Sequence, residues 1–295
     1  MLQPEEFDVK RIIRDNHFQR FDVVASEPLA DVVQRKKIKP KDEVLIVERA
    51  GQRLAFSLYQ MTYHHVAQGE LGGQPFILAF CAICHGATTM VPVLDDGALH
   101  HYSCIGVYNG MALLQDDETG SYWDHISGEC LHGPMKGAVM QLVPVEHITV
   151  AQALKRWPDL KIALSQQPWY RKLFLEPLMN FFGDRGIFPP YFRFSMGKRD
   201  TRLSDMVSGL GIYTKNTKRF YTIRTIQEAG GAINDRIDGR TVSITLNVDG
   251  HPQAVFDDTG EKPMQLYSRW YGFAYTFPGC ELYGDPPEAK EEKAS

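Results

Sequence analysis

A repeated order of glycine-containing hairpins constrains the fold of this 295-residue chain more than any other feature. In the first copy, residues 44–48 and 53–58 are predicted strands, because each is a β-rich run bounded by turn residues. A Gly72-Gly73 turn then leads into the apolar run 75–80, which has the length and composition of a buried strand. The first copy is therefore predicted to contain two consecutive hairpins.

The second copy has the same order of elements later in the chain. Residues 211–213 and 219–223 form a predicted hairpin, and a turn at Gly239 leads into the apolar run 241–246. Gly239 corresponds to Gly73 of the first copy. The repeat predicts an α+β fold dominated by antiparallel sheet, built from two related β-rich halves with few helices.

Composition divides the chain into five segments. The expected segments are a lead-in (residues 1–43), a first β-rich half that carries a thiol pair (44–172), an ordered crossing segment rich in aromatic residues and proline (173–202), a second β-rich half without the thiols (203–284) and a disordered tail (285–295).

Charge and hydropathy narrow the expected partners. The apolar content of 43% and charged content of 23% are typical of a globular protein rather than a disordered one. The net charge is −4 and no long basic run is present, so nucleic acid and membranes are not expected partners. No run approaches the roughly 20 apolar residues of a membrane span, and the acidic N-terminus does not resemble a signal peptide. We expect a cytoplasmic protein, unless a leader has been removed, with a small-molecule substrate; the oligomeric state is left open.

A thiol pair follows the first apolar strand. Cys81, Cys84 and His85 place two thiols and an imidazole within five residues, at the end of a rigid element. The second copy has Asn247-Val248-Asp249-Gly250 at the corresponding place. Because the hairpins are repeated and the thiols are not, the pair is predicted to be functional rather than part of the repeated core.

The other cysteines are predicted to have a packing role. Cys104, Cys130 and Cys280 are scattered along the chain, and an odd total of five argues against a disulfide scaffold. We expect these three to be small buried side chains.

Several motifs resemble a bacterial and archaeal family catalogued as domain of unknown function 3179. The motifs are Tyr63-His64-His65 through Gly72-Gly73-Gln74-Pro75, Cys81-Ala82-Ile83-Cys84, Asp117-Glu118-Thr119-Gly120-Ser121-Tyr122-Trp123 with Ser127-Gly128-Glu129, Asp200-Thr201-Arg202-Leu203, and Trp270-Tyr271-Gly272-Phe273-Ala274. The chain departs from the family at His65, where an acidic residue is usual, at Ala82, where proline is usual, and at His85. The resemblance covers about residues 40–285; it implies no particular activity, but it supports grouping His64 with Cys81 and Cys84.

Metal binding is the first interpretation of the thiol pair. Cys81 and Cys84, completed by His64 or His85, would form a Cys/His site for copper, zinc or iron. Residues 59–63 are predicted to be a short helix, and neighbouring helix residues point about 100° apart. We therefore expect His64 to share a metal with the thiols and His65 to point elsewhere.

Three other interpretations remain open. A metal-free thiol–disulfide pair would need a thiol of lowered pKa. The letters of Cys81–His85 also fit c-type haem attachment, which takes place on the oxidising side of a membrane. Two buried structural thiols are the fourth possibility.

In the region that follows the thiols, adjacent strand residues face opposite sides, so at most one of His100 and His101 can face a site. Residues 116–118 are expected to form a turn.

The function expected from these residues is that of a metal-dependent enzyme, an oxidoreductase acting on a small molecule, with Cys81, Cys84 and His64 as its catalytic residues. A thiol–disulfide protein and a non-catalytic metal-binding or scaffold protein are the alternatives.

Overall fold

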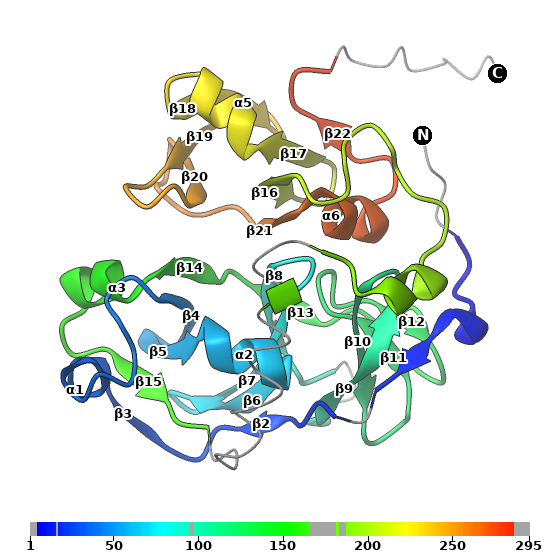
Figure 1. Ribbon diagram of the computed structural model, residues 1–295, viewed down its shortest axis with the longest axis horizontal. Helices are drawn as coiled ribbons and strands as arrows, with labels where there is room; N and C mark the ends of the chain where they lie inside the picture. The colour runs from blue at the N-terminus through cyan, green and yellow to red at the C-terminus, as the bar shows by residue number, and fades with distance from the viewer. Residues whose placement is uncertain (1–4, 16, 95–96, 166–180, 183–186, 286–295) are drawn as a thin grey trace.

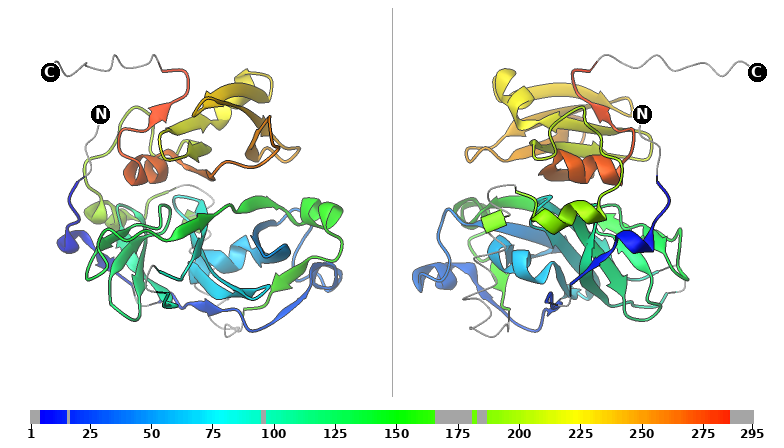
Figure 2. Two further views of the ribbon diagram at one scale, coloured as in Figure 1. Left: turned by 180° about the vertical axis from the view of Figure 1, so that it is seen from behind. Right: turned by 45° about the vertical axis from the view of Figure 1, so that its right-hand side comes forward.

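The computed structural model describes residues 5–15, 17–94, 97–165, 181–182 and 187–285. The predicted predominance of antiparallel sheet with few helices is confirmed. Five sheets are arranged like the blades of a five-bladed propeller (Figure 1), an arrangement that the repeat alone does not predict. Figure 2 shows the two sheets of the second copy lying together above the other three.

The first copy begins with two hairpins separated by a short helix. Its elements are β4 (Glu43–Arg49), β5 (Gln52–Ser57), α2 (Leu58–His64), β6 (Val66–Leu71), β7 (Gln74–Cys81) and β8 (Gly86–Val91). Strands β4 and β5 belong to one sheet, and β6, β7 and β8 belong to the next.

The second copy has the same elements in the same order. They are β16 (Ser208–Tyr213), β17 (Lys218–Thr222), α5 (Ile223–Glu228), β18 (Ala232–Ile237), β19 (Arg240–Leu246) and β20 (Pro252–Phe256). The second hairpin of each copy also has the same register: Leu71 pairs with Gln74 at the first turn, and Ile237 with Arg240 at the second. At both turns the glycines adopt positive φ, +61° at Gly72 and +82° at Gly239.

Each copy is closed by a later strand, a helix and a short strand that pairs in parallel. In the first, β14 (Glu146–Thr149) pairs antiparallel with β4, α3 (Val150–Arg156) follows, and β15 (Lys161–Ala163) pairs parallel with β5. In the second, β21 (Gln265–Arg269), α6 (Trp270–Thr276) and β22 (Glu281–Leu282) have the same relation to β16 and β17. The repeated unit is therefore longer than the two hairpins recognised in the sequence.

The fifth sheet comes from a segment inserted into the first copy. Its strands are β9 (Tyr102–Tyr108), β10 (Met111–Asp116), β11 (Tyr122–Asp124) and β12 (Cys130–His132), with β1 (Ile13–Arg14) at its edge. Strand β13 (Gln141–Val143) then returns to pair with β8.

The described part of the first 43 residues contributes three short strands to the sheets, so it packs with the first copy. Strands β2 (Phe21–Asp22) and β3 (Ser26–Pro28) extend two sheets of the first copy, and β1 extends the inserted sheet. The short helices here and in the crossing segment are η1 (Val9–Arg11), α1 (Leu29–Gln34) and η2 (Pro190–Ser195). Residues 173–180 and 183–186 of the crossing segment, and all but the first residue of the tail expected to be disordered, lie outside the described residues.

The largest apolar core joins the two copies. It packs the β7–β8 turn and the inserted sheet against α6, with Trp123, Trp270 and Phe273 among its fully buried side chains. Among the described helices, none is long and apolar enough to cross a membrane.

Candidate metal centre

The two thiols lie at a tight turn inside the largest core. Cys81 ends β7 and pairs with Gly86, the first residue of β8, so Cys84 lies within the connection between them. The amide of His85 donates to the carbonyl oxygen of Cys81 (2.7 Å), which closes the turn. The exposed fractions of Cys81 and Cys84 are 2% and 0%. The turn thus directs both sulfurs away from solvent.

The imidazole that joins the thiols is that of His125. Its Nε2 atom lies 3.4 Å from Sγ of Cys84, and the ligand atoms of Cys81, Cys84 and His125 all lie within 4.8 Å of one another. These separations allow two thiolates and one imidazole to share a metal, since zinc–ligand bonds are about 2.0–2.3 Å long. His125 is completely buried, and its Nδ1 atom has no hydrogen-bond partner within the described part of the chain.

A turn stabilised by Asp124 holds His125 in place. One carboxylate oxygen of Asp124, at the end of β11, accepts hydrogen bonds from the amides of Ile126 (2.8 Å) and Ser127 (2.7 Å). The turn reverses the chain immediately after His125 and directs its ring into the core.

Hydrogen bonds to sulfur favour a thiolate at Cys81. Burial alone would raise the pKa of Cys81. Three hydrogen bonds act against burial: one from the Cys84 thiol and two from the amides of Cys84 and Ala112. Together with the nearby His125 imidazole, they lower the pKa of Cys81 to about 6. Burial and the adjacent Cys81 raise the pKa of Cys84 well above its usual value. Of the two thiols, Cys81 therefore ionises more readily, and a bound cation would stabilise its thiolate.

Helix α6 and the residue before it pack against the thiol turn. The amide of Arg269 donates to the carbonyl oxygen of Cys84 (2.8 Å), and its guanidinium donates to that of Ile83. A Cβ atom at Gly272 would lie 2.8 Å from Cys84 Cβ, so only glycine allows α6 to approach this closely. The second copy therefore forms one wall of the site.

His64 does not join the thiols, contrary to the sequence-based expectation. Its Nδ1 atom donates to the carbonyl oxygen of Gln19 (2.6 Å), and its Nε2 atom is hydrogen-bonded to Ser165 Oγ (2.7 Å). The metal-capable group around the thiols contains His125 instead. The physical reason is that residues near both ends of the first copy pack around the end of α2 and take up both ring nitrogens of His64.

His65, expected to point away from the thiols, is buried and does not belong to the group of ligand atoms that meet at them. Helix α2 ends at His65 with a left-handed φ of +59°, and its ring packs against Phe18 at a centroid distance of 4.2 Å. Burial and the nearby His125 lower the pKa of His65 to about 3. The lowered pKa keeps His65 a neutral imidazole at neutral pH.

His85 points away from the thiols into a second group. Its φ of +58° turns its side chain to the other side of the β7–β8 turn, where it meets Glu43 and His147. Burial and His147 lower the pKa of His85 to about 3. The imidazoles of His147 and His251 beside Glu43 outweigh the effect of burial and lower the pKa of Glu43 below its usual range. His85 is not a fourth ligand at the thiol group.

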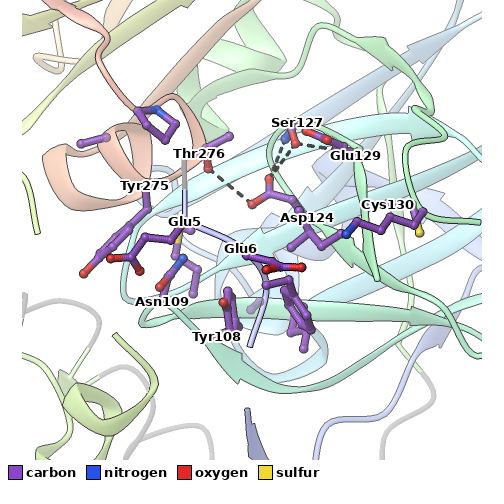
Figure 3. A pocket seen from close by; sticks show the side chains of 18 of the residues that line it. Glu5, Glu6, Tyr108, Asn109, Asp124, Ser127, Glu129, Cys130, Tyr275 and Thr276 are labelled. Carbon is purple, nitrogen blue, oxygen red and sulfur yellow. Dashed lines mark hydrogen bonds between the residues drawn. The ribbon is translucent and has the colours of Figure 1, made fainter. Parts of the chain in front are cut away.

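A pocket of about 290 Å³ lies between the inserted sheet and the end of α6 (Figure 3). Asp124 lines it, and Thr276 Oγ1 donates to Asp124 across it (3.5 Å). Ala112, whose amide points at Cys81, lines it as well, while Glu5 and Glu6 lie on its other side. The pocket therefore adjoins the thiol group through Ala112 and the residue preceding His125.

The remaining cysteines and histidines named in the sequence lie outside the thiol group. Cys104, Cys130 and Cys280 are free and buried, as expected. His100 is buried with Nδ1 3.6 Å from an Asp116 oxygen, whereas His101 is half-buried and bound to Glu118 (2.7 Å).

Comparison with protein-family models gives one match, described as a protein of unknown function (DUF3179), over residues 24–269. No curated protein and no solved structure matches the chain. Because the family model covers most of the chain, this protein is a member of the DUF3179 family.

Proposed function

We propose that the protein binds one transition-metal ion through Cys81, Cys84 and His125 and uses it to oxidise or reduce a small molecule. The observation that carries the proposal is the convergence of these three donors, from two segments far apart in the sequence, at a buried point. Burial raises the pKa of Cys84, whereas a cation at the same point would stabilise both sulfurs as thiolates.

The donor set favours a soft metal. Two thiolates and an imidazole suit Cu(I) and zinc, and iron fits if further ligands come from the substrate or solvent. His125 would bind through Nε2, the atom that faces Cys84. A bound metal would supply Lewis acidity or, for copper or iron, electron transfer; the amides that point at the sulfurs would keep the thiolates deprotonated.

The adjacent pocket supports a small-molecule substrate. It has the size of a site for a small metabolite and is lined by carboxylates, amides and aromatic rings. A molecule bound there would contact Ala112 and Asp124, which border the thiol group.

A thiol–disulfide protein is the second candidate, because the pKa of Cys81 is lowered to about 6. Exchange with another protein also requires access to a sulfur, and the sulfurs lie within the core. Haem attachment is not proposed, since its motif uses the histidine as axial ligand and His85 turns toward Glu43.

Elemental analysis of the purified chain and of the Cys81→Ser/Cys84→Ser variant tests the proposal. We expect a stoichiometric soft metal that the double substitution removes. A metal-free wild type with a reversible Cys81–Cys84 disulfide would instead support the thiol–disulfide function. Full metal occupancy without turnover of any redox substrate would favour a metal-binding or scaffold role.

A further inference from the structure

A second group of metal-binding side chains lies on the other side of the thiol turn. Ligand atoms of Glu43, His85 and His147 all lie within 4.8 Å of one another. A fourth residue, His251, donates from Nε2 to Oε1 of Glu43 (2.5 Å). Three imidazoles and a carboxylate are the donors that zinc and iron(II) sites use.

The three histidine rings are held in a fixed stack. His147 lies between the other two, with ring centroids 5.1 Å from those of both His85 and His251. The ring of Tyr267 packs against all three, at centroid distances of 5.3–5.7 Å. The packing orients the imidazoles before any ligand arrives, which lowers the cost of binding.

Buried nitrogens in this group lack partners. The side chain of His147 is only 8% exposed, and its Nε2 atom, 3.5 Å from Oε2 of Glu43, makes no hydrogen bond to any described residue. The Nδ1 atom of His251 is likewise buried without a partner in the described structure. Buried polar atoms are nearly always satisfied, so the nitrogen of His147 beside a carboxylate marks a place for a further ligand.

The internal repeat explains how the group arises. His85 and His251 are equivalent, because each is the last residue before the third strand of its copy, β8 or β20. His147 and Tyr267 are also equivalent, since they pair with Leu45 of β4 and Leu210 of β16. The group therefore lies where the two copies face each other, and interfaces of this kind are common places for ligand sites.

We propose that Glu43, His85 and His147 form a second metal site, for a divalent first-row transition ion of the zinc or iron(II) type. His251 is a positioning residue that holds the Glu43 carboxylate. The site opens into a groove of about 960 Å³ lined by Glu43, His85 and His251, so the ion keeps coordination positions for water or a substrate. The proposal does not depend on metal at the thiols, because the two groups share no side chain.

Cobalt(II) titration of the full-length Cys81→Ser/Cys84→Ser variant tests the second site without the first. We expect it to bind one equivalent of Co²⁺, with d–d absorption and no thiolate charge-transfer band, and Zn²⁺ to displace it. Adding Glu43→Gln or His147→Gln should weaken binding about 100-fold, and adding His251→Gln about 10-fold, as for residues that orient a metal ligand. His132→Gln, which alters an exposed imidazole stacked on Tyr122, is the matched control and should change nothing.

The proposal is overturned if the folded double variant binds no Co²⁺, or if Glu43→Gln and His147→Gln bind it as tightly as the control. Should the double variant not fold, the same substitutions in the wild-type chain give the answer. In that chain, Glu43→Gln must remove the d–d bands of Co²⁺ bound at the second site. Any thiolate charge-transfer band from Co²⁺ at the thiols must remain. A spectrum that Glu43→Gln leaves unchanged would contradict the second site.

Discussion

Replacing His125 by alanine is expected to abolish stoichiometric metal binding at the thiols. His125 supplies the imidazole nearest to Cys84, and two thiolates without it keep only part of the donor set. We expect the affinity for Zn²⁺ or Cu(I) to fall at least about 100-fold, since loss even of a residue that orients a ligand costs 10–100-fold. Competition with a chelator of known affinity measures the change.

His64→Ala is the matched control for this substitution, because His64 is also a buried histidine of the first copy. Its ring nitrogens bind Gln19 and Ser165, so its removal should reduce stability and leave the metal affinity unchanged. If instead His64→Ala released the metal and His125→Ala retained it, the ligand set derived from the structure would be wrong.

Asp116→Asn is expected to destabilise the fold by about 2–3 kcal/mol, the cost of leaving a buried donor unsatisfied. Asp116 is completely buried, and its two carboxylate oxygens accept hydrogen bonds from the amide and hydroxyl of Thr119 and from Nε1 of Trp123 (2.8 Å). An asparagine has one acceptor oxygen, so its NH₂ group would face one of these donors. Urea unfolding measures the loss. Asp117→Ala is the control: its carboxylate forms an exposed ion pair with Arg20, and such pairs contribute about 1 kcal/mol or less.

Asp116 should also make stability depend on pH. Burial alone would raise the pKa of Asp116, but hydrogen bonds from Trp123 and Thr119 outweigh burial and lower it. A carboxyl group with a lowered pKa in the folded state contributes stability above its unfolded value, near 3.9, and loses it as the pH falls toward the folded value. The free energy of unfolding should therefore decline less steeply below about pH 4 in Asp116→Asn than in the wild type. Parallel slopes for the two proteins would contradict this assignment.

The strands and turns of the two hairpins in each copy could be predicted from the sequence alone. Alternating and apolar runs bounded by Gly72-Gly73 and Gly239 depend on local backbone preferences, so they could be recognised without tertiary contacts. The closing strands β14 and β21 were not recognised as part of the repeat, because each pairs with a strand far away in the sequence.

The thiols could be identified in advance, but their imidazole could not. His125 follows the Trp123 motif by two residues, yet its approach to Cys84 depends on how the inserted sheet packs on the β7–β8 turn. The error over His64 comes from tertiary packing, since Gln19 and Ser165 bind its ring, whereas the error over His85 has a local cause. His65 and His85 both adopt left-handed φ values, and such a residue redirects its side chain in a way that helix or strand periodicity does not predict.

X-ray absorption spectroscopy of the Glu43→Gln chain loaded with one equivalent of Zn²⁺ tests the thiol centre most directly, because the substitution removes the second proposed site. We expect two sulfur scatterers at about 2.3 Å and at least one imidazole nitrogen at about 2.0 Å. Loss of the imidazole signal in Glu43→Gln/His125→Ala would identify the nitrogen ligand. A first shell of nitrogen and oxygen only, with no sulfur, would contradict a metal centre built on Cys81 and Cys84.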